Sequence, residues 1–158
     1  MTMSTHHTSD THLLLIEKVL LLKSLSIFAE TPETVLTEIA EILEEVEIDK
    51  GTTIFEEGDV ASAMYIICRG EINIHKDNKT LAILRENDFF GDLALLDTET
   101  RSANATANTN VHLLKMDQDP FYELMENRIE VARGIIKTLC RRLREQNRKS
   151  LENSIAKQ

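Results

Sequence analysis

The feature that most constrains this chain is a change in the spacing of its apolar residues, from helical to alternating and back to helical. Between about residues 45 and 117 the apolar residues alternate with polar ones in short runs, separated by glycines and by Asp- and Asn-containing turns. The predicted strands are Val46–Ile48, Thr52–Phe55, Ala63–Cys68, Glu71–His75, Thr80–Leu84, Ser102–Ala107 and Val111–Met116. Several short strands at this spacing favour a sandwich or barrel over a parallel α/β sheet.

Helical spacing of apolar residues lies on both sides of this β-region. On the N-terminal side it extends from residue 12 to about 28 and then, from a start signal at Thr31–Pro32, to about residue 43. On the C-terminal side, Asp119–Pro120 predicts a helix start, and the helical face reaches residue 151 or 155 with a bend near Gly134. The expected fold is therefore α+β, with a small antiparallel β-barrel between N-terminal and C-terminal helices.

Length and composition favour one domain. With 158 residues, of which 42% are hydrophobic and 28% charged, the chain has the size and composition of a single globular unit. Residues 1–11 are polar and aperiodic, which predicts a flexible tail before a domain at 12–158, with its barrel at about 45–117 and its last helices at about 119–152. His6 and His7 in the tail have no further ligands at a useful spacing, so no metal is expected.

Charge and cysteine content limit the partners. A net charge of −9 argues against non-specific nucleic-acid binding, and the basic residues of the last helix complement its dipole, so no DNA partner is expected. The longest apolar run, Leu13–Ile16, is broken at Glu17 and predicts neither a membrane span nor a signal peptide. Cys68 and Cys140 lack metal-site spacing, and as unpaired thiols they fit a cytoplasmic location.

The segment FFGDLALLDTETRSANATA, residues 89–107, is the candidate for ligand chemistry. Gly91 permits a tight turn, and residues 92–96 then form a short helical turn whose first N–H groups are exposed. Arg101 and Ser102 follow at the start of the next strand and add a guanidinium and a hydroxyl group. N–H donors, one arginine and one hydroxyl suit a single anion, above all a phosphate.

A plain connecting loop is the alternative for the same residues. In that interpretation the segment only joins two strands, and Arg101 pairs with a nearby acid such as Asp97 or Glu99. Residue types and spacing alone leave the anion site and the loop equally open.

The segment closely resembles the phosphate-binding cassette of cyclic nucleotide-binding domains, a family that includes the catabolite activator protein, regulatory subunits of cyclic AMP-dependent kinase and cyclic nucleotide-gated channels. The cassette reads roughly F-G-E-hydrophobic-A-L, then R-[ST/A]-A after a few variable residues. The matching residues here are Phe90, Gly91, Asp92, Leu93, Ala94, Leu95, Arg101, Ser102 and Ala103. Matching glycines and strands upstream extend the resemblance to roughly residues 15–150. It implies a jelly-roll barrel, or double-stranded β-helix, with C-terminal hinge and lid helices.

The resemblance implies a role for each cassette residue toward a cyclic nucleotide. The N–H groups near Leu93 and Ala94 would cap the cyclic phosphate, and Arg101 would neutralise its charge. Ser102 would donate to the phosphate or the base. A serine at this position favours cyclic AMP, because threonine tends to accompany cyclic GMP in part of the family.

One position departs from the family pattern. The usual glutamate is Asp92, which would accept from the ribose 2′-hydroxyl beside Gly91, where the sugar approaches. Aspartate keeps the charge but is one methylene shorter, so it reaches the hydroxyl through a water or after a loop shift. Losing such a charge-assisted hydrogen bond costs on the order of 1.5–3 kcal/mol, which is roughly ten- to hundredfold in affinity.

The base-contacting residue comes from the last helix in this family. The candidates here are the polar residues Gln146 and Asn147, with Arg142 and Arg144 nearby. The alternative for these residues is an ordinary solvated helix surface.

Nothing in the sequence predicts an enzyme. The acids form no acid/base or metal pattern, and His75 and His112 fall in strand patterns that place them on the sheet surface. The expected function is a non-catalytic regulatory module that binds cyclic AMP or cyclic GMP and signals to an effector protein by movement of its C-terminal helices.

A degenerate copy of the fold is the main alternative function. Such a copy would bind no nucleotide and would serve as a protein-interaction or dimerisation module, with Asp92 as its best support. The last helix could pair with a second copy through Ile135, Leu139 and Leu143. A transcription factor of the catabolite activator type would need a DNA-binding domain beyond the last helix, and is expected only if the chain is a fragment.

Overall fold

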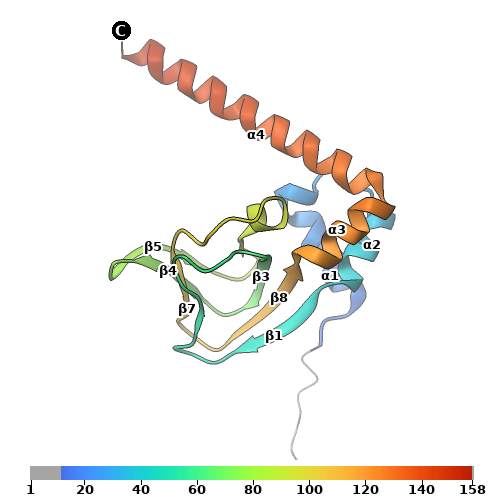
Figure 1. Cartoon of the computed structure of the whole chain (residues 1–158), viewed down its shortest axis with the longest axis vertical. Coiled ribbons are helices and arrows are strands. Elements are labelled where there is room, and N and C mark those ends of the chain that lie inside the picture. Colours follow the sequence, from blue (N-terminus) through green and yellow to red (C-terminus); the bar gives the residue numbers. More distant parts are fainter. Residues whose placement is uncertain (1–11, 158) are drawn as a thin grey trace, which may run out of the picture.

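The computed structural model describes residues 12–157 as a β-unit with three helices gathered at one end and a fourth, long helix running past it (Figure 1). The helices are α1 (Leu15–Ser24), α2 (Glu33–Glu41), α3 (Gln118–Asn127) and α4 (Ile129–Ala156), with 3₁₀ helices η1 (Ser26–Phe28) and η2 (Asp92–Leu95). The strands are β1 (Glu44–Ile48), β2 (Thr53–Phe55), β3 (Ala63–Arg69), β4 (Ile72–Lys76), β5 (Lys79–Leu84), β6 (Phe89–Phe90), β7 (Asn104–Ala107) and β8 (Val111–Asp117). The predicted tail, with His6 and His7, lies outside the described residues.

The strands form two four-stranded antiparallel sheets, in the orders β1-β8-β3-β6 and β2-β7-β4-β5. β8 pairs with both β1 and β3, with Leu113 opposite Val46 and Leu114 opposite Ile66. This arrangement confirms the predicted α+β class and its antiparallel β-unit. The two-residue strand β6 was not predicted, because Phe89–Phe90 is too short to show an alternation.

The first sheet is buried on both faces. Ile66 and Leu114 pack with the helices in one cluster, while Ile67 and Leu113 pack between the two sheets in another. Successive residues of a strand point to opposite faces, so a sheet covered on both sides needs nearly continuous apolar strands. This explains why β3 is an almost uninterrupted run of apolar residues and why β8 has apolar residues on both of its faces.

The helical cover explains one wrong prediction. His112 was expected on the sheet surface, but it is buried, and its Nε2 lies 3.5 Å from Glu45 Oε1. It lies on the face of the sheet that the N-terminal segment covers, where the Leu13 N–H also donates to Glu45 at 2.6 Å. His75 is half-buried, and its Nε2 lies 2.8 Å from Thr106 Oγ1.

The C-terminal helices are separated at a residue that the sequence did not indicate. The backbone leaves helical geometry at Arg128 (φ −133°, ψ 88°), and α4 then continues as one unbroken helix through Gly134. Gly134 permits a close contact, because a Cβ atom there would lie 3.1 Å from Thr31 Oγ1. The glycine serves helix packing, which its position in the sequence alone could not distinguish from a bend.

No helix within residues 12–157 combines the length and the apolar character that crossing a bilayer requires.

Candidate functional site

The segment 89–107 forms strand β6, helix η2, a loop and strand β7, and it lies at the side of the β-unit that faces α4. Gly91 joins β6 to η2 with φ +77°, a left-handed conformation that favours glycine. The predicted helical turn is a 3₁₀ turn, in which the Ala94 N–H donates to the Gly91 carbonyl at 3.1 Å. Of the two N–H groups expected to cap a phosphate, that of Ala94 is therefore engaged within the turn.

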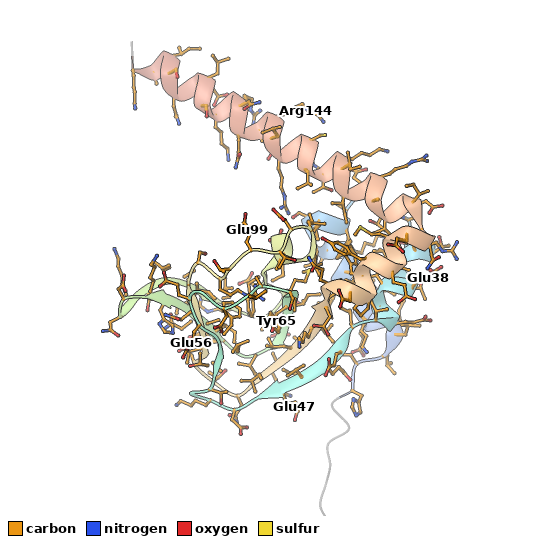
Figure 2. The ribbon with its side chains drawn as sticks, viewed as in Figure 1. Glu38, Glu47, Glu56, Tyr65, Glu99 and Arg144 are labelled. Carbon is orange, nitrogen blue, oxygen red and sulfur yellow. The ribbon has the colours of Figure 1, made fainter. Side chains whose placement is uncertain are left out.

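Arg101 lies directly behind Gly91. Its Nη2 donates to the Ala63 carbonyl at 2.7 Å, and its guanidinium carbon lies 4.1 Å from the centre of the Phe55 ring. Phe55 belongs to an aromatic cluster in which Tyr65 and Phe90 stack with their ring centres 5.1 Å apart. Figure 2 shows Tyr65 within the β-unit. These contacts fix the planar guanidinium with one side against the aromatic rings.

The electrostatic state of Arg101 distinguishes the two interpretations of the loop. Burial lowers the pKa of its guanidinium, with smaller opposing contributions from Tyr65 and Asp59, yet an arginine stays charged in proteins. No carboxylate among residues 12–157 forms an ion pair with Arg101, so the predicted pairing with Asp97 or Glu99 is absent. A half-buried cation without a counter-ion is costly, and a bound anion offsets that cost.

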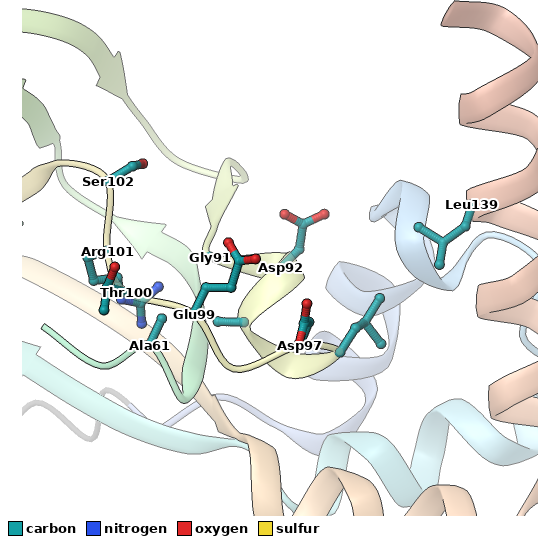
Figure 3. Close-up of a pocket in the computed structure, with 11 residues that line it drawn as sticks. Ala61, Gly91, Asp92, Asp97, Glu99, Thr100, Arg101, Ser102 and Leu139 are labelled. Carbon is teal, nitrogen blue, oxygen red and sulfur yellow. The ribbon is translucent and has the colours of Figure 1, made fainter. Parts of the chain in front are cut away.

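A pocket of about 520 Å³ opens in front of Arg101, within the size range of small-ligand sites. Its lining residues are Ala61, Gly91, Asp92, Ala94, Leu96, Asp97, Glu99, Thr100, Arg101, Ser102 and Leu139. The cassette residues line one side, and Leu139 of α4 lies across from them (Figure 3). Leu139 was expected only on an apolar helix face, because a helical pattern does not show which cavity a face borders.

Asp92 has a partner that the sequence did not indicate. Its Oδ2 accepts from Arg142 Nη1 of α4 at 3.0 Å, and Arg142 Nη2 donates to Ser26 Oγ at 2.7 Å. Arg142 was noted only as a neighbour of the base-contact candidates, since no local pattern signals a pair that is separated by 50 residues.

The structure gathers most of the predicted site residues and leaves two apart. Gly91, Asp92, Ala94, Arg101 and Ser102 line the pocket, and Ser102 is exposed to it; the Leu93 backbone belongs to η2. The two predicted base-contact residues, Gln146 and Asn147, are exposed on α4 and do not line the pocket. Within residues 12–157, no group of three or more His, Cys, Asp or Glu side chains is arranged to hold a metal ion.

Comparison with known proteins identifies the family. Residues 45–128 match the family described as "Cyclic nucleotide-binding domain", a range that includes both sheets, the pocket loop and α3. The chain belongs to this family. Most of the residues that line the domain's pocket belong to the segment 89–107, which resembles the family's phosphate-binding cassette.

Similar proteins include regulators and kinases. A "CRP-like cAMP-activated global transcriptional regulator" of Mycobacterium tuberculosis is 29% identical over 126 residues, which is 77% of this chain and 56% of the regulator. "cGMP-dependent protein kinase 2" of Mus musculus is 31% identical, over 76% of this chain and 17% of the kinase. The domain thus spans about half of the first relative and a smaller part of the second.

A solved structure supports the fold. The N-terminal domain of a transcriptional regulator from Streptomyces coelicolor is similar with a TM-score of 0.78 at 28% sequence identity. The match covers 82% of this chain and 94% of that structure, so nearly the whole of that domain has a counterpart here.

Proposed function

We propose that this domain is a non-catalytic regulatory module that binds cyclic AMP in the pocket between the cassette and α4. The observation that carries the proposal is Arg101, a half-buried guanidinium with no carboxylate partner among residues 12–157, which lines that pocket. The named relatives respond to cyclic AMP or cyclic GMP, so either ligand has the right chemistry. Ser102 favours cyclic AMP.

In this proposal the cyclic phosphate lies against Arg101, with the Leu93 N–H and the Ser102 hydroxyl as further donors. The ribose 2′-hydroxyl donates to Asp92, whose carboxylate lines the pocket. Binding draws α4 toward the ligand, because Leu139 already borders the pocket from that helix. The movement is passed to an effector protein in the cytoplasm, and no DNA contact is proposed for this chain.

Calorimetric titration with cyclic AMP and with cyclic GMP tests the proposal. We expect saturable binding of one nucleotide per chain, with cyclic AMP the tighter ligand. Ligand at a hundred times its Kd adds about 2.7 kcal/mol to stability, which raises the melting temperature by roughly 5–10 °C in a domain of this size. No heat from either nucleotide at millimolar concentration would exclude the proposed ligand class.

Gln146 and Asn147, the two base-contact candidates, are predicted to differ in how much they contribute to cyclic AMP binding. Gln146 follows Leu139 by seven residues and Arg142 by four, so it continues the side of α4 that borders the pocket. Asn147 is the next residue after Gln146, which places it roughly 100° further round the helix and away from that side. We expect Gln146→Ala to weaken cyclic AMP binding about three- to tenfold, the value of one hydrogen bond, and Asn147→Ala to leave the Kd unchanged in the same titration. Equal effects of the two substitutions would contradict the assignment.

A dimerisation role is the second candidate function, and the exposed surface of α4 favours it. Five large apolar side chains on this helix are more than half exposed, and they are Ile129, Ile136, Leu143, Leu151 and Ile155. Their spacing of seven, seven, eight and four residues keeps them within one broad side of the helix, as in helices that pair with a second helix. We propose that α4 pairs with a second copy of the chain, with or without a bound nucleotide.

The double substitution Leu143→Glu, Leu151→Glu is expected to make the protein monomeric. Burying two carboxylates in a helix pair costs several kcal/mol, enough to dissociate a micromolar dimer. Sedimentation velocity at several concentrations measures the change, and Leu81→Glu on β5 is the matched control, since Leu81 is also more than half exposed. A wild-type protein that stays monomeric at high concentration would refute the pairing.

A further inference from the structure

The pocket is bordered by more acids than bases. The carboxylates of Asp92, Asp97 and Glu99 line it together with the guanidinium of Arg101 (Figure 3). Asp92 is paired with Arg142 of α4, whereas the side chains of Asp97 and Glu99 form no ion pair or hydrogen bond with any other residue in the range 12–157. Beside the unpaired positive charge of Arg101, the pocket therefore carries two unpaired negative charges.

The unpaired charges of opposite sign lie at different depths in the pocket. Arg101 is half-buried, and its Nη2 donates to the Ala63 carbonyl of β3 at 2.7 Å. Asp97 and Glu99 line the same pocket but are exposed, which places them at its opening. An anionic group that approaches Arg101 from solvent must therefore pass close to the two carboxylates.

Hydrogen bonds hold the loop that carries the two acids. On one side, the carbonyl of Leu96, the residue before Asp97, accepts from the Tyr122 hydroxyl of α3 at 2.8 Å. On the other side, the Glu99 carbonyl accepts from the Ala61 N–H at 2.7 Å. The backbone is thus tied to α3 at one end and to the segment before β3 at the other, which keeps both acids at the opening of the pocket.

We propose that Asp97 and Glu99 are specificity-determining residues: they penalise each negative charge of a ligand, so that the pocket takes a singly charged cyclic phosphate in preference to an open nucleotide phosphate. A cyclic phosphodiester carries one negative charge, whereas a phosphate monoester such as 5′-AMP carries two above its second pKa of about 6. Arg101 supplies one positive charge, so the second charge of the monoester stays uncompensated beside the two carboxylates. This inference rests on the proposed function, because it concerns ligands of the same site.

The test compares cyclic AMP with 5′-AMP in the wild type and in the double substitution Asp97→Asn, Glu99→Gln, which removes both charges and keeps the size of the side chains. The Kd values come from competition with a fluorescent cyclic AMP analogue in about 50 mM salt, where charges are weakly screened. We expect the variant to bind cyclic AMP about threefold and 5′-AMP about tenfold more tightly, because a Coulomb energy is proportional to the charge of the ligand. In about 1 M salt, where the Debye length is about 3 Å, both improvements should disappear.

The matched control is Glu123→Gln, Glu126→Gln on α3, which removes two exposed carboxylates that do not line the pocket and should leave both Kd values unchanged. Equal improvement for the two nucleotides, or an improvement that persists at high salt, would show that the acids do not select by charge and would overturn the inference. If millimolar 5′-AMP displaces the analogue from neither protein, the shape of the closed phosphate ring sets the selectivity, which also overturns it. If the wild-type protein does not bind cyclic AMP, the proposed function itself fails.

Discussion

Arg101→Ala is expected to abolish the thermal stabilisation that cyclic AMP gives the wild-type domain. Arg101 is the only cationic side chain that lines the pocket among residues 12–157, so the phosphate would lose that partner in a site that is partly withdrawn from water, where such a hydrogen-bonded ion pair has its largest value. Losing about 3 kcal/mol or more corresponds to at least a hundredfold weaker binding. At a nucleotide concentration that saturates the wild type, the variant should show no measurable shift in melting temperature.

The unliganded Arg101→Ala protein should melt within a few degrees of the wild type, so that a lost shift reports on binding. The substitution removes the hydrogen bond to the Ala63 carbonyl and the contact with the Phe55 ring, which destabilises the fold. It also removes an unpaired, partly buried charge, which stabilises it. The matched control is Arg141→Ala, whose arginine pairs with Glu30 outside the pocket. Equal ligand-induced shifts in wild type and Arg101→Ala would refute the phosphate site.

The sequence predicted those parts of the fold that depend on local pattern. The alternation of apolar residues indicated seven of the strands to within about two residues, since side chains of a strand alternate between two faces wherever the strand lies. The cassette was found for the same reason, because Gly91, Arg101 and Ser102 lie within one short segment. What remained open there was the electrostatic environment of Arg101, which depends on Ala63 and Phe55 from other strands.

The features that the sequence missed depend on contacts between distant segments. The burial of His112 follows from helices that cover the first sheet, and a strand pattern is the same with or without that cover. The pairing of Asp92 with Arg142 requires the direction of α4 relative to η2, which helical periodicity does not contain. The break between α3 and α4 lies at Arg128, and Gly134 within α4 packs closely against Thr31, a contact that the sequence pattern does not contain. In each case the sequence showed the local pattern of the residue but not the contact that the residue makes with a distant segment.

The position of Asp92 also changes how its departure from the family pattern is understood. Considered alone, a shorter acid suggests a weakened ribose site and favours a copy of the fold without nucleotide. In the structure the carboxylate is held by Arg142 and lines the pocket next to Gly91, so its reach is set by a fixed geometry. The degenerate alternative thus loses part of its support, and the calorimetric titration with cyclic AMP and cyclic GMP decides between the two.

Gly91→Ala is expected to remove nucleotide binding and to destabilise the fold at the same time. The residue has φ +77°, where an alanine is strained by about 1–2 kcal/mol. Its Cβ atom would also lie 2.6 Å from Arg101 Nη1 and 3.0 Å from the Ala63 carbonyl oxygen. The guanidinium must then leave its place, and with it the hydrogen bond to Ala63. We expect a total loss of about 2–4 kcal/mol, a decrease in melting temperature of roughly 5–15 °C, and no binding of cyclic AMP.

Gly58→Ala is the control that separates the effect of backbone strain from the effect of a steric clash. Gly58 has a similar φ of +89°, but a Cβ atom there would have no neighbour within 4 Å among the described residues. Strain alone should lower its stability by about 1–2 kcal/mol, and cyclic AMP should still bind with the wild-type Kd, because Gly58 does not line the pocket. If both alanine variants lost the same stability and both still bound the nucleotide, the close approach of Gly91 to Arg101 would have no role in the site. A selective loss of binding in Gly91→Ala would show that the glycine is required because the arginine lies directly behind it.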